Sequence, residues 1–156
     1  MTADDVLLGR IEAVYRASFQ RFYRVAVAVL HDDGLAWDAV QDGFAGAIRG
    51  RSGFRAEAPL EAWLWRAVIN AAIRESKRHS DLRVSEVPDA EELPQGRDLV
   101  DLSALSERQR LVVFLRYYAD LDERTIGAAL GIERGTVSAT LHRALKALRR
   151  DLEVPR

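Results

Sequence analysis

The chain has 156 residues, 48% of them hydrophobic and 30% charged, which suits one ordinary domain or two small ones. The sequence contains no cysteine, which excludes disulfides, thiolate metal sites and a cysteine nucleophile. No apolar run approaches the length of a membrane span, and the first residues lack the basic start of a signal peptide. We therefore expect a cytoplasmic protein that makes no membrane contact by itself.

The net charge of -1 conceals two basic blocks. Residues 43–84 carry 8 basic and 4 acidic side chains, and residues 123–150 carry 6 and 2. Between these blocks, residues 85–101 carry 1 basic and 6 acidic side chains. Local charge decides whether phosphates are attracted, because screening limits electrostatic reach to about 8–10 Å at physiological salt.

The first half of the chain predicts three helices, because apolar residues recur at steps of three and four. The predicted helices cover residues 7–30, 35–48 and 59–78. Residues 49–58 have two glycines and no periodicity, which favours a loop, and Pro59 suits the first turn of the third helix. Within that helix we expect Trp63 to pack in the core and Trp65 to be exposed.

The second half begins with a break in the pattern. Residues 81–102 hold two prolines, one glycine and the acidic cluster, which favours a flexible linker. Ser106, followed three residues later by Gln109, indicates the capped start of a helix. The sequence therefore predicts an all-α chain of two small helical domains, residues 1–80 and 103–156, joined by a flexible acidic linker.

Residues 121–150 indicate a helix-turn-helix in the C-terminal domain. Apolar residues lie where the two helices must bury them, and Gly131 lies where the turn needs a residue that tolerates positive φ. Such a unit presents its second helix to the major groove of DNA, so we expect the chain to bind DNA.

Four stretches carry family motifs in order: residues 36–44 (AWDAVQDGF), 63–70 (WLWRAVIN), 105–110 (LSERQR) and 131–137 (GIERGTV). Together they resemble bacterial RNA polymerase sigma factors of the extracytoplasmic-function type. The resemblance implies an alternative sigma factor with a region 2 domain over residues 1–80, a linker over 81–102 and a region 4 domain over 103–156. It also implies three partners, namely core RNA polymerase, promoter DNA and an anti-sigma protein, and no cofactor.

The resemblance assigns the docking surface for core polymerase to an acidic face of the second helix. That face holds Asp38, Gln41 and Asp42, which steps of three and four bring together. Taken alone, such residues are also what an ordinary solvated helix face contains. Trp37 stands where the family usually has an acid.

The loop and the third helix carry the residues implied for the minus-ten promoter element. They are Arg49, Arg51, Ser52, Phe54, Arg55, Arg66, Asn70, Arg74 and Lys77. Cations, glycines and a ring suit single-stranded DNA, and the resemblance implies a base flipped into this loop with help from Asn70. A plain polar loop and the polar face of an amphipathic helix are the alternatives.

The second helix of the helix-turn-helix carries the residues implied for the minus-thirty-five element. They are Arg134, Thr136, Ser138, Ala139, Thr140, Arg143 and Lys146. Residues 138–140 stand where the family commonly has two cations around a serine, so we expect more anchoring through phosphates and less base choice. Gly127 stands where the family has alanine.

Two other classes of protein remain to be weighed. An ordinary helix-turn-helix regulator with an N-terminal dimerisation or ligand domain would not need the acidic helix beside a basic loop. A small helical enzyme would need a reactive constellation, and the sequence shows no nucleophile–base pattern and no shared site for its three histidines. We therefore expect no catalytic residue and no metal site.

Overall fold

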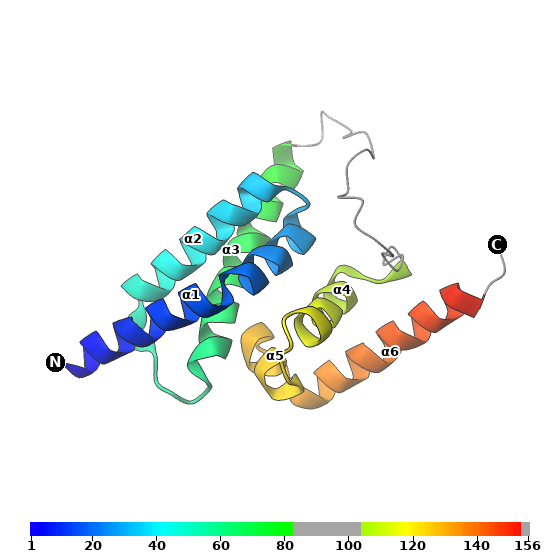
Figure 1. Ribbon diagram of the computed structural model, residues 1–156. Helices are drawn as coiled ribbons and strands as arrows, with labels where there is room; N and C mark the ends of the chain where they lie inside the picture. The colour runs from blue at the N-terminus through cyan, green and yellow to red at the C-terminus, as the bar shows by residue number, and fades with distance from the viewer. Residues whose placement is uncertain (83–103, 154–156) are drawn as a thin grey trace.

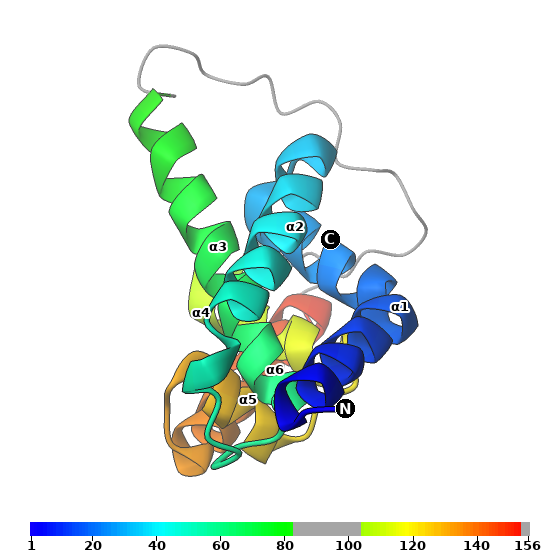
Figure 2. The same cartoon turned by 90° about the vertical axis from the view of Figure 1, so that its left-hand side faces the viewer.

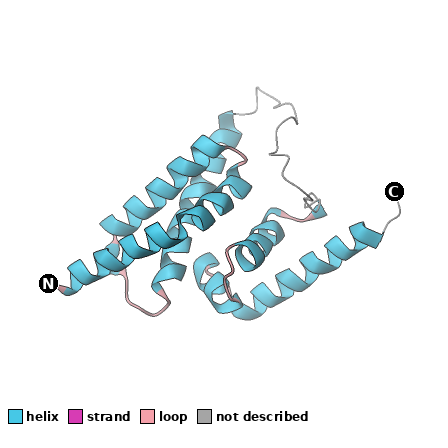
Figure 3. Cartoon of the chain, in the orientation of Figure 1, coloured by secondary structure: helices cyan, strands magenta, loops and turns pink. Residues whose placement is uncertain are grey.

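The structure, a computed structural model, describes residues 1–82 and 104–153, and these form helices and short turns without strands (Figure 3). The N-terminal unit holds α1 (Ala3–Leu30), α2 (Asp33–Arg49), the 3-10 turn η1 (Arg51–Gly53) and α3 (Leu60–Leu82). The C-terminal unit holds α4 (Glu107–Val113), the π-helical turn η4 (Phe114–Tyr118), α5 (Glu123–Leu130) and α6 (Arg134–Glu153). The predicted all-α class is confirmed. The predicted linker lies outside the described residues except at its first two positions.

Capping explains where the first two helices begin. Thr2 and Asp5 form a reciprocal capping box, so α1 starts four residues before the first apolar position of its stripe. The Asp32 side chain accepts the N–H of Leu35 and caps α2. Between them, His31 ends α1 in the left-handed conformation with φ 54°.

The core of the N-terminal unit is built around aromatic rings. Phe22 of α1 and Trp65 of α3 are fully buried, and their rings stack with centroids 3.9 Å apart. Gly43 of α2 faces Val68 of α3, where a Cβ atom would come within 2.7 Å of the Val68 Cα. The glycine therefore lets the two helices pack backbone against backbone.

The prediction that Trp65 is exposed is wrong. The periodicity of α3 suggested one apolar stripe, but α1 and α2 both pack against α3, so two of its faces are buried. Trp65 lies on the face toward Phe22 of α1. Trp63, which was expected in the core, is half-buried and packs against it.

The C-terminal unit relies on short helices with defined ends. The predicted capping box of Ser106 and Gln109 is confirmed at the start of α4. Asp122 caps α5 by accepting the N–H of Thr125, and Gly131 ends that helix with φ 68°, as the turn requires. A Cβ on Gly127 would lie 2.8 Å from the carbonyl oxygen of Ile132, so the tight turn explains this glycine.

The two units lie against each other (Figures 1 and 2). The main contact joins α3 to α5, and α1 touches α4 and η4. On the second contact, Arg24 Nη1 donates a hydrogen bond of 2.6 Å to the Tyr118 hydroxyl, and the guanidinium lies 5.3 Å from the centre of that ring. Contacts between α3 and α5 determine which parts of the predicted DNA-binding surfaces are exposed.

Candidate functional site

The acidic face of α2 is present and partly tied to α1. Asp38 and Asp42 are exposed, whereas Gln41 is half-buried and its amide nitrogen donates a 2.8 Å hydrogen bond to the Tyr15 hydroxyl. The two carboxylates are therefore available to a partner, while the amide nitrogen of Gln41 is engaged by Tyr15.

An aromatic row that the sequence reasoning missed borders this face. Trp37 is 50% exposed and meets Phe19 edge-on, with ring centroids 5.1 Å apart. Phe19 stacks in turn on Tyr23 at 6.0 Å, and burial together with Asp33 raises the pKa of the Tyr23 hydroxyl. The four-residue spacing of Tyr15, Phe19 and Tyr23 on α1 was the available signal.

Arg51, one of the predicted minus-ten cations, is held by the start of α1. Its Nε and Nη2 donate to the two carboxylate oxygens of Asp4 at 2.8 and 2.9 Å, and Nη1 donates to the carbonyl oxygen of Ile48 at 2.7 Å. The hydrogen bonds with Asp4 raise the pKa of the guanidinium further. Arg51 thus fixes the shape of η1, while Arg49, Ser52 and Arg55 are exposed around it.

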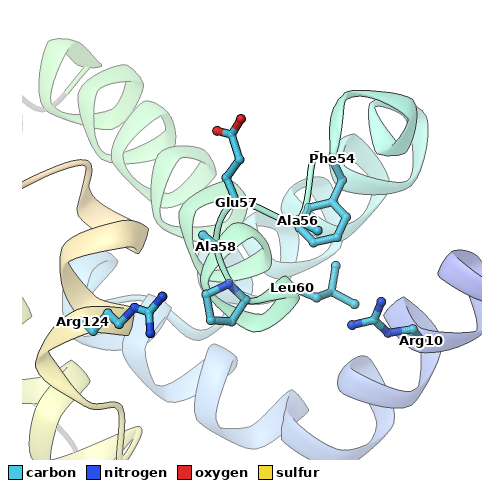
Figure 4. A pocket seen from close by; sticks show the side chains of 8 residues that line it. Arg10, Phe54, Ala56, Glu57, Ala58, Leu60 and Arg124 are labelled. Carbon is cyan, nitrogen blue, oxygen red and sulfur yellow. The ribbon is translucent and has the colours of Figure 1, made fainter.

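Phe54 is half-buried rather than free. Its ring lies against Trp63, with centroids 5.3 Å apart and the planes tilted by 51°. Figure 4 shows the ring at the edge of a shallow pocket, with Arg10 of α1 and Arg124 of α5 reaching in from opposite sides. The pocket combines a ring with cations, which is a combination that can hold a nucleotide base and its phosphate.

The outer face of α3 carries the other predicted minus-ten residues. Arg66, Asn70, Arg74 and Lys77 are all exposed and follow one another at steps of four and three. The C-terminal unit lies close to part of this face. Asn70 and Lys77 line a groove shared with α4 and α5, and the Arg66 guanidinium lies 3.8 Å from where a Cβ on Gly131 would be.

The second helix of the helix-turn-helix presents most of the predicted minus-thirty-five residues. Arg134, Thr136, Ser138, Arg143 and Lys146 are exposed, and Ala139 is half-buried. Thr140 differs, because it is 7% exposed and its hydroxyl donates to the carbonyl oxygen of Thr136 at 2.7 Å. The prediction that Thr140 contacts DNA with the other residues of this helix is therefore wrong, because α6 packs against α4 as well as α5.

A carboxylate from α5 reaches the predicted base-reading residues. The Ser138 hydroxyl donates to Oε2 of Glu123, and Nε of Arg134 lies 4.0 Å from the same oxygen. Sequence reasoning did not single out Glu123, because nothing in the spacing of residues 123 and 138 shows that their side chains meet.

No group of three or more His, Asp or Glu side chains among the residues that the structure describes could hold a metal ion. None of the described helices is both long and apolar enough to cross a membrane.

Known families match both units. The family described as sigma-70 region 2 matches residues 14–81, and the family described as sigma-70, region 4 matches residues 102–150. The chain is 30% identical to the RNA polymerase sigma-E factor of Streptomyces antibioticus, over 98% of this chain and 89% of that protein. It is 28% identical to the ECF RNA polymerase sigma factor SigM of Mycobacterium tuberculosis, over 89% and 75%.

The fold also matches a solved structure. The sigma factor RpoE of Bartonella quintana, solved in complex with the anti-sigma factor NepR, superposes with a TM-score of 0.71 at 22% identity. The match covers 93% of this chain and 98% of that one. From the region 2 and region 4 matches and the sigma-E relative, the chain belongs to the RNA polymerase sigma factors, and within them to the extracytoplasmic-function type.

Proposed function

We propose that this alternative sigma factor directs promoter-specific transcription initiation through three surfaces on two units. Residues 1–80 bind core polymerase and the minus-ten element, residues 103–156 bind the minus-thirty-five element, and residues 81–102 connect them. The chain acts in the cytoplasm and catalyses no covalent step itself. The observation that carries the proposal is the separation of an acidic helix face, a cationic loop-and-helix surface and a helix-turn-helix within one chain of this family.

Core polymerase binds the acidic face of α2. Asp38 and Asp42 supply exposed charge, which speeds association and sets register, while Gln41 is oriented by Tyr15. The double variant Asp38→Ala/Gln41→Ala should weaken binding to core polymerase by roughly tenfold. The control is Glu12→Ala, which removes an exposed acid of α1. Equal affinity of the double variant and the control in a titration with core enzyme would contradict this assignment.

The minus-ten element binds the loop around η1 and the outer face of α3. Arg49, Arg55 and Arg74 contact phosphates, and the part of the pocket that the N-terminal unit forms with Phe54 and Arg10 receives an unstacked base. Asn70 contributes amide hydrogen bonds to that strand. Arg51 acts mainly by holding η1 in shape, because Asp4 already engages its guanidinium.

The minus-thirty-five element binds α6. Arg143 and Lys146 contact phosphates on either side of the groove, while Arg134, Thr136, Ser138 and Ala139 lie at the beginning of the helix, where base edges are reached. Thr140 contributes to the packing of α6 instead.

Promoter binding requires the two units to move apart. With α5 packed on α3, Arg66 and Asn70 face the helix-turn-helix and a DNA duplex has no room there. An anti-sigma protein that stabilises this packed arrangement would block the minus-ten surface on α3, and the related RpoE was solved in complex with an anti-sigma factor. Regulation by an anti-sigma protein is therefore part of the proposal.

In vitro transcription tests the function as a whole. Core polymerase supplemented with this chain should initiate RNA synthesis from a cognate promoter that core polymerase alone does not use. A stand-alone regulator, which the comparisons do not favour, would act only when another sigma factor is present. RNA synthesis that still depends on a second sigma factor would overturn the proposal.

A further inference from the structure

We infer that Glu123 is a specificity-determining residue for the minus-thirty-five element, because it restricts Ser138 to accepting hydrogen bonds from DNA bases. The inference rests on the proposed role of α6 in binding the minus-thirty-five element and adds which bases one of its residues selects. At the position that Ser138 faces, the protein selects adenine or cytosine over guanine or thymine on the contacted strand.

The geometry joins the two helices of the helix-turn-helix at their DNA-facing ends. Glu123 is the first residue of α5, directly after the capping residue Asp122, so its backbone is held by the cap. Its carboxylate accepts the Ser138 hydroxyl and lies 4.0 Å from Arg134. The Glu123 side chain is 32% exposed, which leaves it open to solvent on one side.

Ser138 is placed to touch a base. It is the fifth residue of α6 and is exposed, and the beginning of a recognition helix is the part that reaches base edges in the major groove. The neighbouring Thr140 is buried and engaged with Thr136, so it offers no competing hydroxyl to DNA.

The hydrogen bond to Glu123 decides what Ser138 offers to a base. A serine hydroxyl has one proton to donate and two lone pairs to accept with. A bond to a carboxylate is charge-assisted and roughly twice as strong as a neutral one, so the proton stays directed at Glu123. Only the lone pairs then remain for DNA.

A Ser138 hydroxyl that can only accept hydrogen bonds distinguishes bases that carry an amino group from bases that do not. In the major groove, adenine and cytosine each present an amino donor, whereas guanine and thymine present only acceptor atoms at the corresponding edge. The Glu123 carboxylate behind Ser138 can likewise only accept, and it repels the carbonyl oxygens of guanine and thymine. Both groups therefore favour an amino-bearing base.

The test is selection from promoters randomised over the minus-thirty-five element, using core polymerase reconstituted with the full chain. The wild-type protein should prefer adenine or cytosine at one position by roughly 3- to 10-fold, the value expected for one net hydrogen bond. Ser138→Ala should abolish that preference. Glu123→Ala should also abolish it, because the freed hydroxyl can then donate to guanine or thymine.

Glu133→Ala is the control that separates the loss of a negative charge near DNA from the loss of the hydrogen bond to Ser138. Glu133 is also an exposed acid next to Arg134, but in the described part of the structure its side chain has no hydrogen bond or ion pair. Removing either acid should raise overall affinity for promoter DNA, while only Glu123→Ala should change the base preference. Arg143→Ala should weaken binding to all sequences alike if α6 contacts DNA as proposed.

Three results would overturn the inference: no position that changes in Ser138→Ala, a wild-type preference for guanine or thymine there, or an unchanged preference in Glu123→Ala. If Arg143→Ala has no effect and the selection shows no preferred minus-thirty-five base, then the proposed role of α6 itself fails. The two failures are thus distinguishable in one experiment.

Discussion

The N-terminal and C-terminal units of this sigma factor are stabilised internally in different ways. The N-terminal unit buries large rings between long helices, with Phe22 stacked on Trp65. The fully buried large residues of the C-terminal unit are aliphatic, and its α4 and α5 span seven and eight residues. Short helices gain little stability by themselves, so caps and turn geometry carry more of the C-terminal fold.

Of the substitutions that test this comparison, removal of the Trp65 ring should cause the largest loss of stability. Trp65→Ala should destabilise the N-terminal unit by about 3–5 kcal/mol, because it leaves a large cavity against Phe22. Chemical denaturation with hydrogen exchange resolved by unit would measure it. Trp65→Phe is the control, since it keeps a ring and removes an indole N–H that has no partner among the described residues. A loss below about 1 kcal/mol in Trp65→Ala would contradict ring-centred packing.

A methyl group at the tight turn should affect the C-terminal unit alone. In Gly127→Ala, the added Cβ meets the Ile132 carbonyl oxygen, and the strain exceeds the gain in helix propensity. We expect a net loss of about 1–2 kcal/mol, seen as faster hydrogen exchange in α5 and α6. Gly9→Ala is a suitable control, because nothing lies within 4 Å of the new Cβ. Equal stability of wild type and Gly127→Ala would show that the turn can relax.

Loss of the α5 cap should cost less and should depend on pH. Asp122→Ala should destabilise the C-terminal unit by about 1 kcal/mol at pH 7. The N–H of Thr125 lowers the pKa of the Asp122 carboxyl, so the cap stabilises above the unfolded pKa of about 4 and is lost as pH falls through the lower folded pKa. The gap between wild type and Asp122→Ala should therefore shrink below about pH 4. A gap that is constant down to pH 2 would contradict the role of the carboxylate.

The smallest expected effect concerns the contact between the units. Tyr118→Phe removes the hydroxyl that accepts from Arg24 but keeps the ring below the guanidinium. Each unit should keep its own stability, while the packed arrangement weakens by about 1 kcal/mol or less. Energy transfer between dyes on the two units would report a shift toward the open arrangement. Tyr117→Phe changes a neighbouring exposed hydroxyl and should leave the transfer unchanged.

Periodicity predicted the helices well because each helix has an apolar stripe that a neighbour covers. The second helix, for example, was expected over residues 35–48 and spans Asp33–Arg49. Capping chemistry added the start of α4, where Ser106 and Gln109 form the expected box. Apolar periodicity and capping residues depend only on residues that are close in the sequence, so a single sequence can reveal them.

The errors and omissions share a different cause. Trp65 was expected to be exposed and Thr140 to contact DNA because one apolar stripe indicates one covered side, whereas α3 and α6 each pack against more than one other helix. Asp4 and Arg51 are 47 residues apart, and no pattern in the chain shows that their side chains meet. Contacts between residues that are far apart in the sequence, including Glu123 with Ser138, could be found only in the folded structure.

The three tryptophans of the chain give it built-in optical reporters. The indole of Trp37 is half-exposed beside the acidic face of α2, that of Trp63 lies on Phe54, and that of Trp65 is fully enclosed. Solvent exposure shifts indole emission to longer wavelength, so a partner that covers Trp37 should blue-shift the spectrum while the signal from Trp65 stays constant. Single-tryptophan variants can then follow polymerase binding near Trp37, the proposed capture of a promoter base beside Phe54 and loss of the core separately, without an added dye.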